Sequence, residues 1–214
     1  MGPVVDIPLR EPLTEDQAIE LERWLRSITS RIEGEWLDWW PFWIKDGRLI
    51  GLPVAACGAA CAFGLGVEDT KTEQDYMEDG WIDPAIRAEL KEERTQTLAH
   101  LGYYPKQSIN IYAGCNGPLD HRILGHLALR LAERYDGIID MDGAIRPPLR
   151  PGGRDELDNY PWHTLKEISA FVGPMPGHVF DMYYTVAGDR WVSHMVDTTF
   201  LRAWLEHPHF HMIK

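Results

Sequence analysis

The order of secondary structure elements is clearest between residues 108 and 141, which read SINIYAGCNGPLDHRILGHLALRLAERYDGIIDM. A strand pattern at 108–112 runs into a cluster of turn residues at 114–118. A helix is predicted over 119–135, where apolar residues recur at helical spacing, and a short buried strand follows at 137–141. Strand, helix and strand at this spacing predict a βαβ unit with a right-handed crossover.

The first helix of the chain is predicted upstream of this unit. Thr14 and Gln17 form a capping-box pattern, which marks a helix start. Apolar residues then recur at helical spacing through Leu25 to Ile32, and Gly34 is expected to end the helix.

Two hairpins are predicted on either side of the βαβ unit. The first joins an aromatic strand at 36–44 to a strand at 48–52, and the second joins 179–186 to 191–196. Tryptophans on the aromatic strand alternate between the two sheet faces, so one set packs inward and the other is left for a helix or a partner. Residues 53–66 fit either a close-packed strand or a tight helix.

Two more helices complete the expected fold. One starts at Pro84, with Asp83 as its cap, and uses apolar residues including Leu98 as a core face; the last helix is capped by Asp197. The sequence therefore predicts that residues 1–214 form a single α+β domain: one mixed β-sheet with packed helices, containing one βαβ unit and two hairpins.

Composition limits the classes of partner and the compartment. The 214 residues carry a formal net charge of −12, and the sequence pI is about 5.1. Nucleic acid and anionic membranes attract basic proteins, so neither is predicted as a partner. The three cysteines (Cys57, Cys61 and Cys115) do not suggest a disulfide framework, and no secretory signal is recognised. We therefore expect a cytoplasmic protein.

The strongest functional signal is an acidic segment at residues 68–83. Seven carboxylates and one lysine give it a net charge of −6, half that of the chain. Like charges at this density favour exposure, and the aromatic residues among them favour contact with a basic protein. A solvated loop that only aids solubility is the alternative. The candidate partner-binding residues are Glu68, Asp69, Glu73, Asp75, Tyr76, Glu78, Asp79, Trp81 and Asp83.

Enzymatic chemistry has weaker signals, and no cofactor or metal is predicted. Cys115 lies where a strand gives way to a helix, a position that lowers a thiol pKa, and His121 is a candidate base. His207, His209 and His211 occupy alternate positions and would share one face of an extended segment, as zinc or nickel ligands can. A small cytosolic enzyme using Cys115 or this histidine-rich end is therefore the alternative function.

Two stretches carry a resemblance to a known family. Residues 120–140, DHRILGHLALRLAERYDGIID, and residues 200–212, FLRAWLEHPHFHM, resemble a bacterial family filed as a domain of unknown function. The resemblance covers roughly the second half of the chain and implies no catalytic residues. As small acidic α+β proteins, they are similar to immunity proteins encoded beside antibacterial toxins. The predicted function is an immunity-type inhibitor, not an enzyme, that neutralises a basic cognate toxin through its acidic and aromatic surface.

Overall fold

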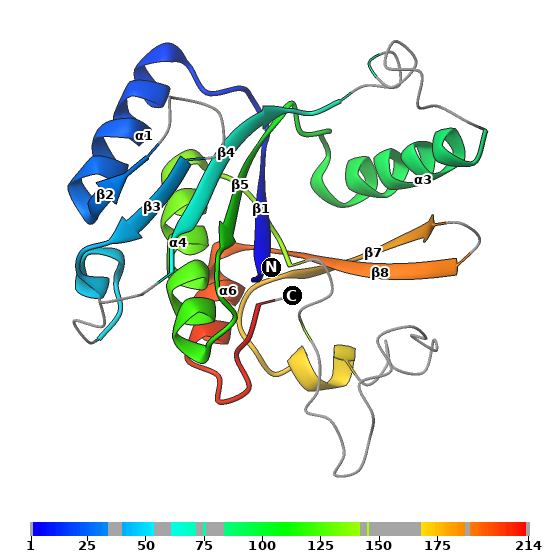
Figure 1. Cartoon of the computed structure of the whole chain (residues 1–214). Coiled ribbons are helices and arrows are strands. Elements are labelled where there is room, and N and C mark those ends of the chain that lie inside the picture. Colours follow the sequence, from blue (N-terminus) through cyan, green and yellow to red (C-terminus); the bar gives the residue numbers. More distant parts are fainter. Residues whose placement is uncertain are drawn as a thin grey trace.

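One open β-sheet organises the fold in the computed structural model, which describes residues 2–33, 40–53, 61–71, 75, 84–141, 145, 168–186 and 189–212 (Figure 1). Its eight strands lie in the order β2-β3-β4-β5-β1-β6-β8-β7. The strands are β1 (Val4–Leu9), β2 (Thr29–Ile32), β3 (Trp40–Ile44), β4 (Phe63–Asp69), β5 (Gln107–Ala113), β6 (Ile139–Asp140), β7 (Val179–Val186) and β8 (Asp189–Val196). The α+β class with one sheet is confirmed. Where a mixed sheet was expected, however, every described strand pair runs antiparallel.

The predicted βαβ unit consists of β5, helix α4 (Pro118–Tyr135) and β6. Both β5 and β6 pair antiparallel with β1, so they run parallel to each other with β1 between them. The N-terminal strand thus fills the gap in a split βαβ unit. No pattern near residues 108–141 predicts this insertion, because β1 lies about a hundred residues away in the sequence.

The main core lies between the sheet and helices α1 (Glu15–Ile28), α4 and α6 (Thr198–Leu205). Along β1, Val5, Ile7 and Leu9 point toward this core and are at most 1% exposed. The α4 side chains that meet them are buried along the predicted apolar stripe, from Ile123 to Leu131. Fully burying one such side chain stabilises the fold by roughly 1.5–3 kcal/mol, so this layer dominates stability.

Helix α1 begins as predicted but ends earlier. Thr14 caps it by accepting the Gln17 N–H at 3.3 Å, while the Gln17 side chain accepts the Thr14 N–H at 2.9 Å. The helix stops at Ile28 and not at Gly34, because the next four residues form β2 and pair with β3. The apolar spacing that reached Ile32 fits a strand equally well, and the ladder with β3 decides between the two.

The first predicted hairpin is wrong. Residues 48–52 do not form a strand, because 48–50 belong to the 3₁₀ turn η1 (Gly47–Ile50). Asp46 caps this turn by accepting the Arg48 N–H at 2.9 Å. Gly51 then takes a left-handed conformation with φ 103°, which favours glycine. The aromatic strand itself, β3, pairs with β2 and β4. On β3, Trp40 is buried, whereas Trp43 is half-buried on the other face beneath the guanidinium of Arg31.

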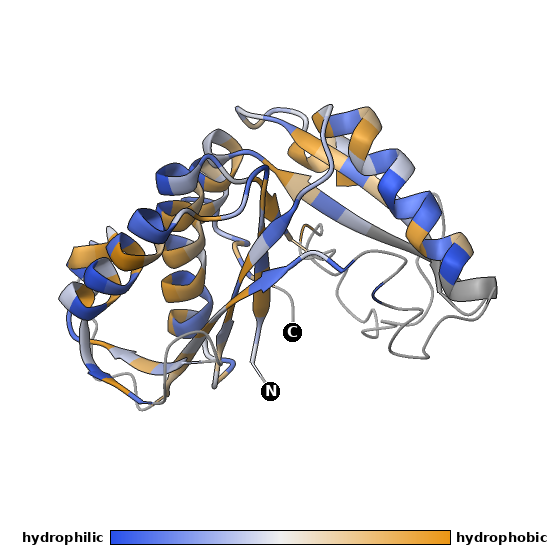
Figure 2. Ribbon diagram, turned by 90° about the horizontal axis from the view of Figure 1, so that it is seen from above, coloured by the Kyte–Doolittle hydropathy of each residue, from blue (hydrophilic) through white to orange (hydrophobic). Residues whose placement is uncertain are grey.

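Helix α3 (Pro84–Leu101) lies on the opposite face of the sheet, against β7 (Figure 1). It begins at Pro84 and ends before Gly102 as predicted, Gly102 has φ 73°, and the predicted cap Asp83 lies outside the described residues. Its expected apolar core face is wrong at Leu98, which is exposed, whereas Thr97 is buried. Hydrophilic residues interrupt the hydrophobic ones along this helix (Figure 2). Helix α3 is therefore solvated at Leu98 but joins a small second core through Leu101, which packs against Ile138, Met182 and Met195.

The C-terminal elements match their prediction, except that β8 begins at Asp189, two residues before the predicted strand at 191–196. Strands β7 and β8 form the second hairpin, in register from Val179↔Val196 to Val186↔Asp189. Asp197 caps α6, which buries Phe200 and Trp204 in the main core. Of residues 53–66, which the sequence left open, 63–66 belong to β4, and 54–60 lie outside the described residues.

Candidate functional site

The acidic segment begins at the end of β4. Glu68 and Asp69 are the last two residues of this strand; both side chains are exposed, as is that of Asp75. The other candidate residues lie outside the described part of the chain: Glu73, Tyr76, Glu78, Asp79, Trp81 and Asp83. Three of the nine candidates are thus at the surface, and their role in binding stays a prediction.

Gln107 fixes the position of Asp69. Its Nε2 donates to Asp69 Oδ1 at 2.8 Å, and its Oε1 accepts the Leu13 N–H at 2.9 Å. Gln107 is also the β5 residue opposite Asp69 in the ladder. A neutral amide therefore orients this exposed carboxylate.

A groove with a volume of about 1140 Å³ opens beside Asp69, between α3 and the adjoining ends of β4 and β5. The described residues that line it include one carboxylate, Asp69, and five cations: Lys71, Arg87, Lys91, Arg94 and Lys106. Tyr104, Leu90 and two prolines, Pro12 and Pro105, add apolar surface. On a chain with a net charge of −12, this groove is a concentrated positive surface, and we refer to it as the cationic groove.

Helix α3 supplies three of the five cations. Arg87, Lys91 and Arg94 follow one another at spacings of four and three residues, which places them on the same face of the helix. Leu90 also lines the groove from this face. This spacing is the sequence signal for the groove, and the sequence analysis did not use it.

Other contacts order the cations at the groove wall. The Arg94 guanidinium carbon lies 5.1 Å from the centre of the Tyr104 ring, within the range of a cation–π interaction. Lys106 Nζ pairs with Glu11 Oε2 at 2.6 Å, and both side chains are more than half exposed. Exposed pairs of this kind contribute about 0–1 kcal/mol, so Lys106 loses little by turning toward a stronger anion. Lys71 and Arg87 also have polar or ionic partners within the molecule.

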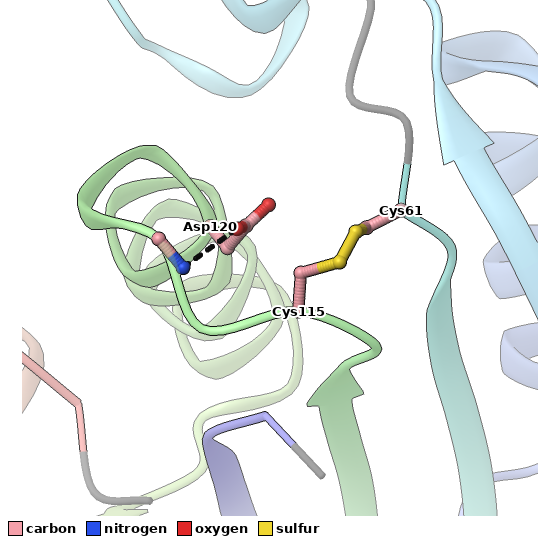
Figure 3. The surroundings of a disulfide bond; sticks show 4 residues. Cys61, Cys115 and Asp120 are labelled. Carbon is pink, nitrogen blue, oxygen red and sulfur yellow. Dashed lines mark hydrogen bonds between the residues drawn. A yellow bond between two sulfur atoms is a disulfide. The ribbon is translucent and has the colours of Figure 1, made fainter.

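Cys115 is bonded to Cys61, which corrects the expectation of free cysteines. The two Cα atoms are 5.7 Å apart, within the usual range for a disulfide. Figure 3 shows Cys61 just before β4 and Cys115 in the turn between β5 and α4, beside Asp120, whose carboxylate accepts the Gly117 N–H. The spacing of the cysteines in the sequence gave no hint of a bond that depends on β4 and β5 being neighbours. A sulfur in a disulfide is not the thiolate that nucleophilic catalysis requires.

His121 is likewise not arranged as a base for Cys115. Its Nδ1 accepts the Met212 N–H at 2.9 Å, and its Nε2 lies 2.9 Å from Asn116 Oδ1. Burial, followed by the neighbouring imidazole of His211, lowers the pKa of His121. The ring is therefore neutral at pH 7, with the proton on Nε2 and both nitrogens occupied.

The three C-terminal imidazoles have separate contacts. His207 stacks on Trp204 with ring centres 4.9 Å apart, and its Nδ1 accepts the His209 N–H at 3.2 Å. His211 donates from Nδ1 to the His209 carbonyl at 2.9 Å. Within the described residues, no group of three or more His, Cys, Asp or Glu side chains has the geometry to hold a metal ion. The two enzymatic alternatives thus find no support in these contacts.

Comparisons with known proteins give one match. A family model described as a family of unknown function (DUF6368) matches residues 1–214. The match spans the whole chain, so the resemblance over the second half of the sequence was drawn too narrowly. No curated protein and no solved structure matches. Among the described residues, no helix has the length and apolar character to cross a membrane.

Proposed function

The chain belongs to this family of unknown function, and we propose that it is a binding protein: an immunity-type inhibitor that captures a basic toxin domain through residues 68–83. The observation that carries the proposal is the exposure of Glu68 and Asp69, where a segment with a net charge of −6 begins. Asp69 is held toward solvent by Gln107, so it meets a partner already oriented.

The proposed mechanism combines steering with anchoring. The carboxylates of residues 68–83 attract a basic surface and raise the rate of encounter. Tyr76 and Trp81 then supply the large side chains that dominate binding energy once they are desolvated. Because the cationic groove lies next to Asp69, the partner must match a negative surface beside a positive one. Such a pattern rejects uniformly basic proteins and supports specificity.

Binding in place of catalysis, and a cytoplasmic location, are parts of the same proposal. The occupied nitrogens of His121 support the first part, whether or not Cys115 is bonded. A cytoplasmic location has a chemical consequence, because disulfides are normally reduced by the cytosolic thiol pool. The inhibitor must therefore bind its partner whether Cys61 and Cys115 are bonded or not.

The proposal is tested by co-expressing the tagged protein with the product of the adjacent open reading frame. A stable stoichiometric complex, together with death of the strain when the gene for this chain is deleted, would support the immunity-type function. An absence of both would reject it, and residues 68–83 would then be better explained as a solvated loop.

A paired set of variants tests the acidic segment itself. We expect Glu68→Gln/Asp69→Asn to weaken capture of the partner by about tenfold, because it removes two exposed charges at the start of the segment. The matched control is Glu15→Gln/Asp16→Asn, which makes the same chemical change at two exposed residues in the first turn of α1. Equal affinities for the two variants in a titration would contradict the proposed binding surface.

A further inference from the structure

We propose that the cationic groove binds a small organic polyphosphate, of the class of nucleoside di- and triphosphates. This site adjoins the acidic segment and shares Asp69 and Lys71 with it, but its ligand does not depend on the proposed protein partner. The described lining has five cations and one carboxylate, and Lys106 also pairs with Glu11 outside the lining. A polyanionic ligand matches this predominance of positive side chains.

The cations approach the groove from three separate parts of the chain. Lys71 follows β4, Arg87, Lys91 and Arg94 project from α3, and Lys106 precedes β5. Convergence of this kind surrounds an anion with donors on several sides, as a flat basic surface cannot. Guanidinium groups pair bidentately with phosphate oxygens, and lysines act as point charges beside them. The groove has both kinds of donor.

The remaining lining favours a ligand with an organic part. Tyr104, Leu90, Pro12 and Pro105 offer apolar surface in the same groove. Ordinary small-molecule sites have volumes of about 300–1,000 Å³, so a groove of about 1140 Å³ holds a nucleotide and exceeds the needs of a bare phosphate. Arg94 lies over the Tyr104 ring, and this pair adds a flat surface on which a planar base can stack.

Charge outside the groove favours a compact ligand over a nucleic acid strand. Glu11 pairs with Lys106 at the groove, Glu68 precedes the lining residue Asp69 on β4, and the chain as a whole carries −12. Screening confines an attraction to about 8–10 Å at physiological salt, so the cations act mainly on anions inside the groove. Phosphates of a long strand would extend toward these carboxylates, where they are repelled.

The test uses a fluorescent, N-methylanthraniloyl-labelled ATP without added metal as the probe, on the full chain. The variant Lys91→Gln/Arg94→Gln removes two exposed groove cations from α3. The matched control, Arg23→Gln/Lys45→Gln, makes the same change at two exposed residues outside the groove. Circular dichroism and thermal melting establish that both variants are folded before they are titrated.

We expect the wild type and the control to bind the probe within about twofold of each other, and the groove variant to bind about tenfold or more weakly. Unlabelled ATP should displace the probe better than inorganic triphosphate, because the apolar lining contacts the organic part. No saturable binding to the wild type, or equal loss in both variants, would overturn the site. Tighter binding of a single-stranded oligonucleotide than of ATP would overturn the ligand class.

Discussion

Asp197 holds together the junction between β8 and α6 with a single carboxylate. Its Oδ1 accepts the Phe200 N–H at 2.7 Å, and its Oδ2 accepts the His178 N–H at 3.0 Å and lies 3.0 Å from His178 Nδ1. Gly177 allows this approach: its φ is 95°, and a Cβ there would lie 2.5 Å from Asp197 Oδ1. Partial burial alone would raise the pKa of Asp197, but the hydrogen bonds from Phe200 and His178 together lower it.

This lowered pKa predicts how stability changes with pH. Because the folded state favours the ionised carboxylate, Asp197 contributes fully above its unfolded pKa of about 3.9 and loses that contribution as the pH falls through the folded pKa. We expect Asp197→Ala to reduce the free energy of unfolding by about 1–2 kcal/mol at pH 7, as N-cap losses do. The deficit should shrink below about pH 4. Urea denaturation from pH 3 to pH 7 measures it, and a deficit independent of pH would contradict the role of the charge.

Local capping is also what the sequence predicted best. Thr14 and Asp197 were recognised as caps because each bonds to a backbone N–H three residues away, so the signal and the structure share one short stretch. The end of α1 and the fate of residues 48–52 were missed for the opposite reason. The helix ends where β2 begins to pair with β3. Strand β3 pairs with β2 on one edge and β4 on the other, so neither edge is left for residues 48–52.

At the scale of elements, the disulfide joins the start of β4 to the turn that leads into α4. Cys61 and Cys115 are 54 residues apart in the sequence, yet β4 and β5 bring them together two residues beyond the Phe63↔Ala113 pair. For a loop of this length, the chain-entropy model gives a stabilisation of about 4 kcal/mol. This stabilisation arises because the bond restricts the unfolded chain, in which the β4–β5 ladder is broken.

We therefore predict that a reductant lowers the melting temperature of the wild type. Cys61→Ser/Cys115→Ser should melt at the temperature of the reduced protein and show no response to the reductant, since the bond is its only target. Cys57→Ser is the matched control and should behave as the wild type. Thermal melts with and without dithiothreitol measure this, and a wild-type melting temperature that the reductant leaves unchanged would contradict the bond.

At the scale of the whole molecule, the α+β class with one sheet was predictable, whereas the antiparallel strand order and the groove were not. Hydrophobic alternation and helical spacing are properties of single segments, so the α+β class and most elements followed from them. The cationic groove joins Lys71, α3 and Lys106, which no local pattern links. The cations at 87, 91 and 94 were visible as one helix face, but only the position of α3 beside β4 and β5 turns that face into the wall of a cavity.

The net charge of −12 also acts on association as a whole, and this predicts how salt affects capture of a basic partner. The screening length falls from about 30 Å at 0.01 M salt to about 3 Å at 1 M, so steering is lost over this range. We expect the association rate constant to fall by about tenfold or more, with little change in dissociation. At low salt Glu68→Gln/Asp69→Asn should associate more slowly than Glu15→Gln/Asp16→Asn, because its lost charges lie in the proposed binding segment. At high salt the two rates should converge. Stopped-flow mixing measures both, and an association rate that does not depend on salt would contradict electrostatic steering by this molecule.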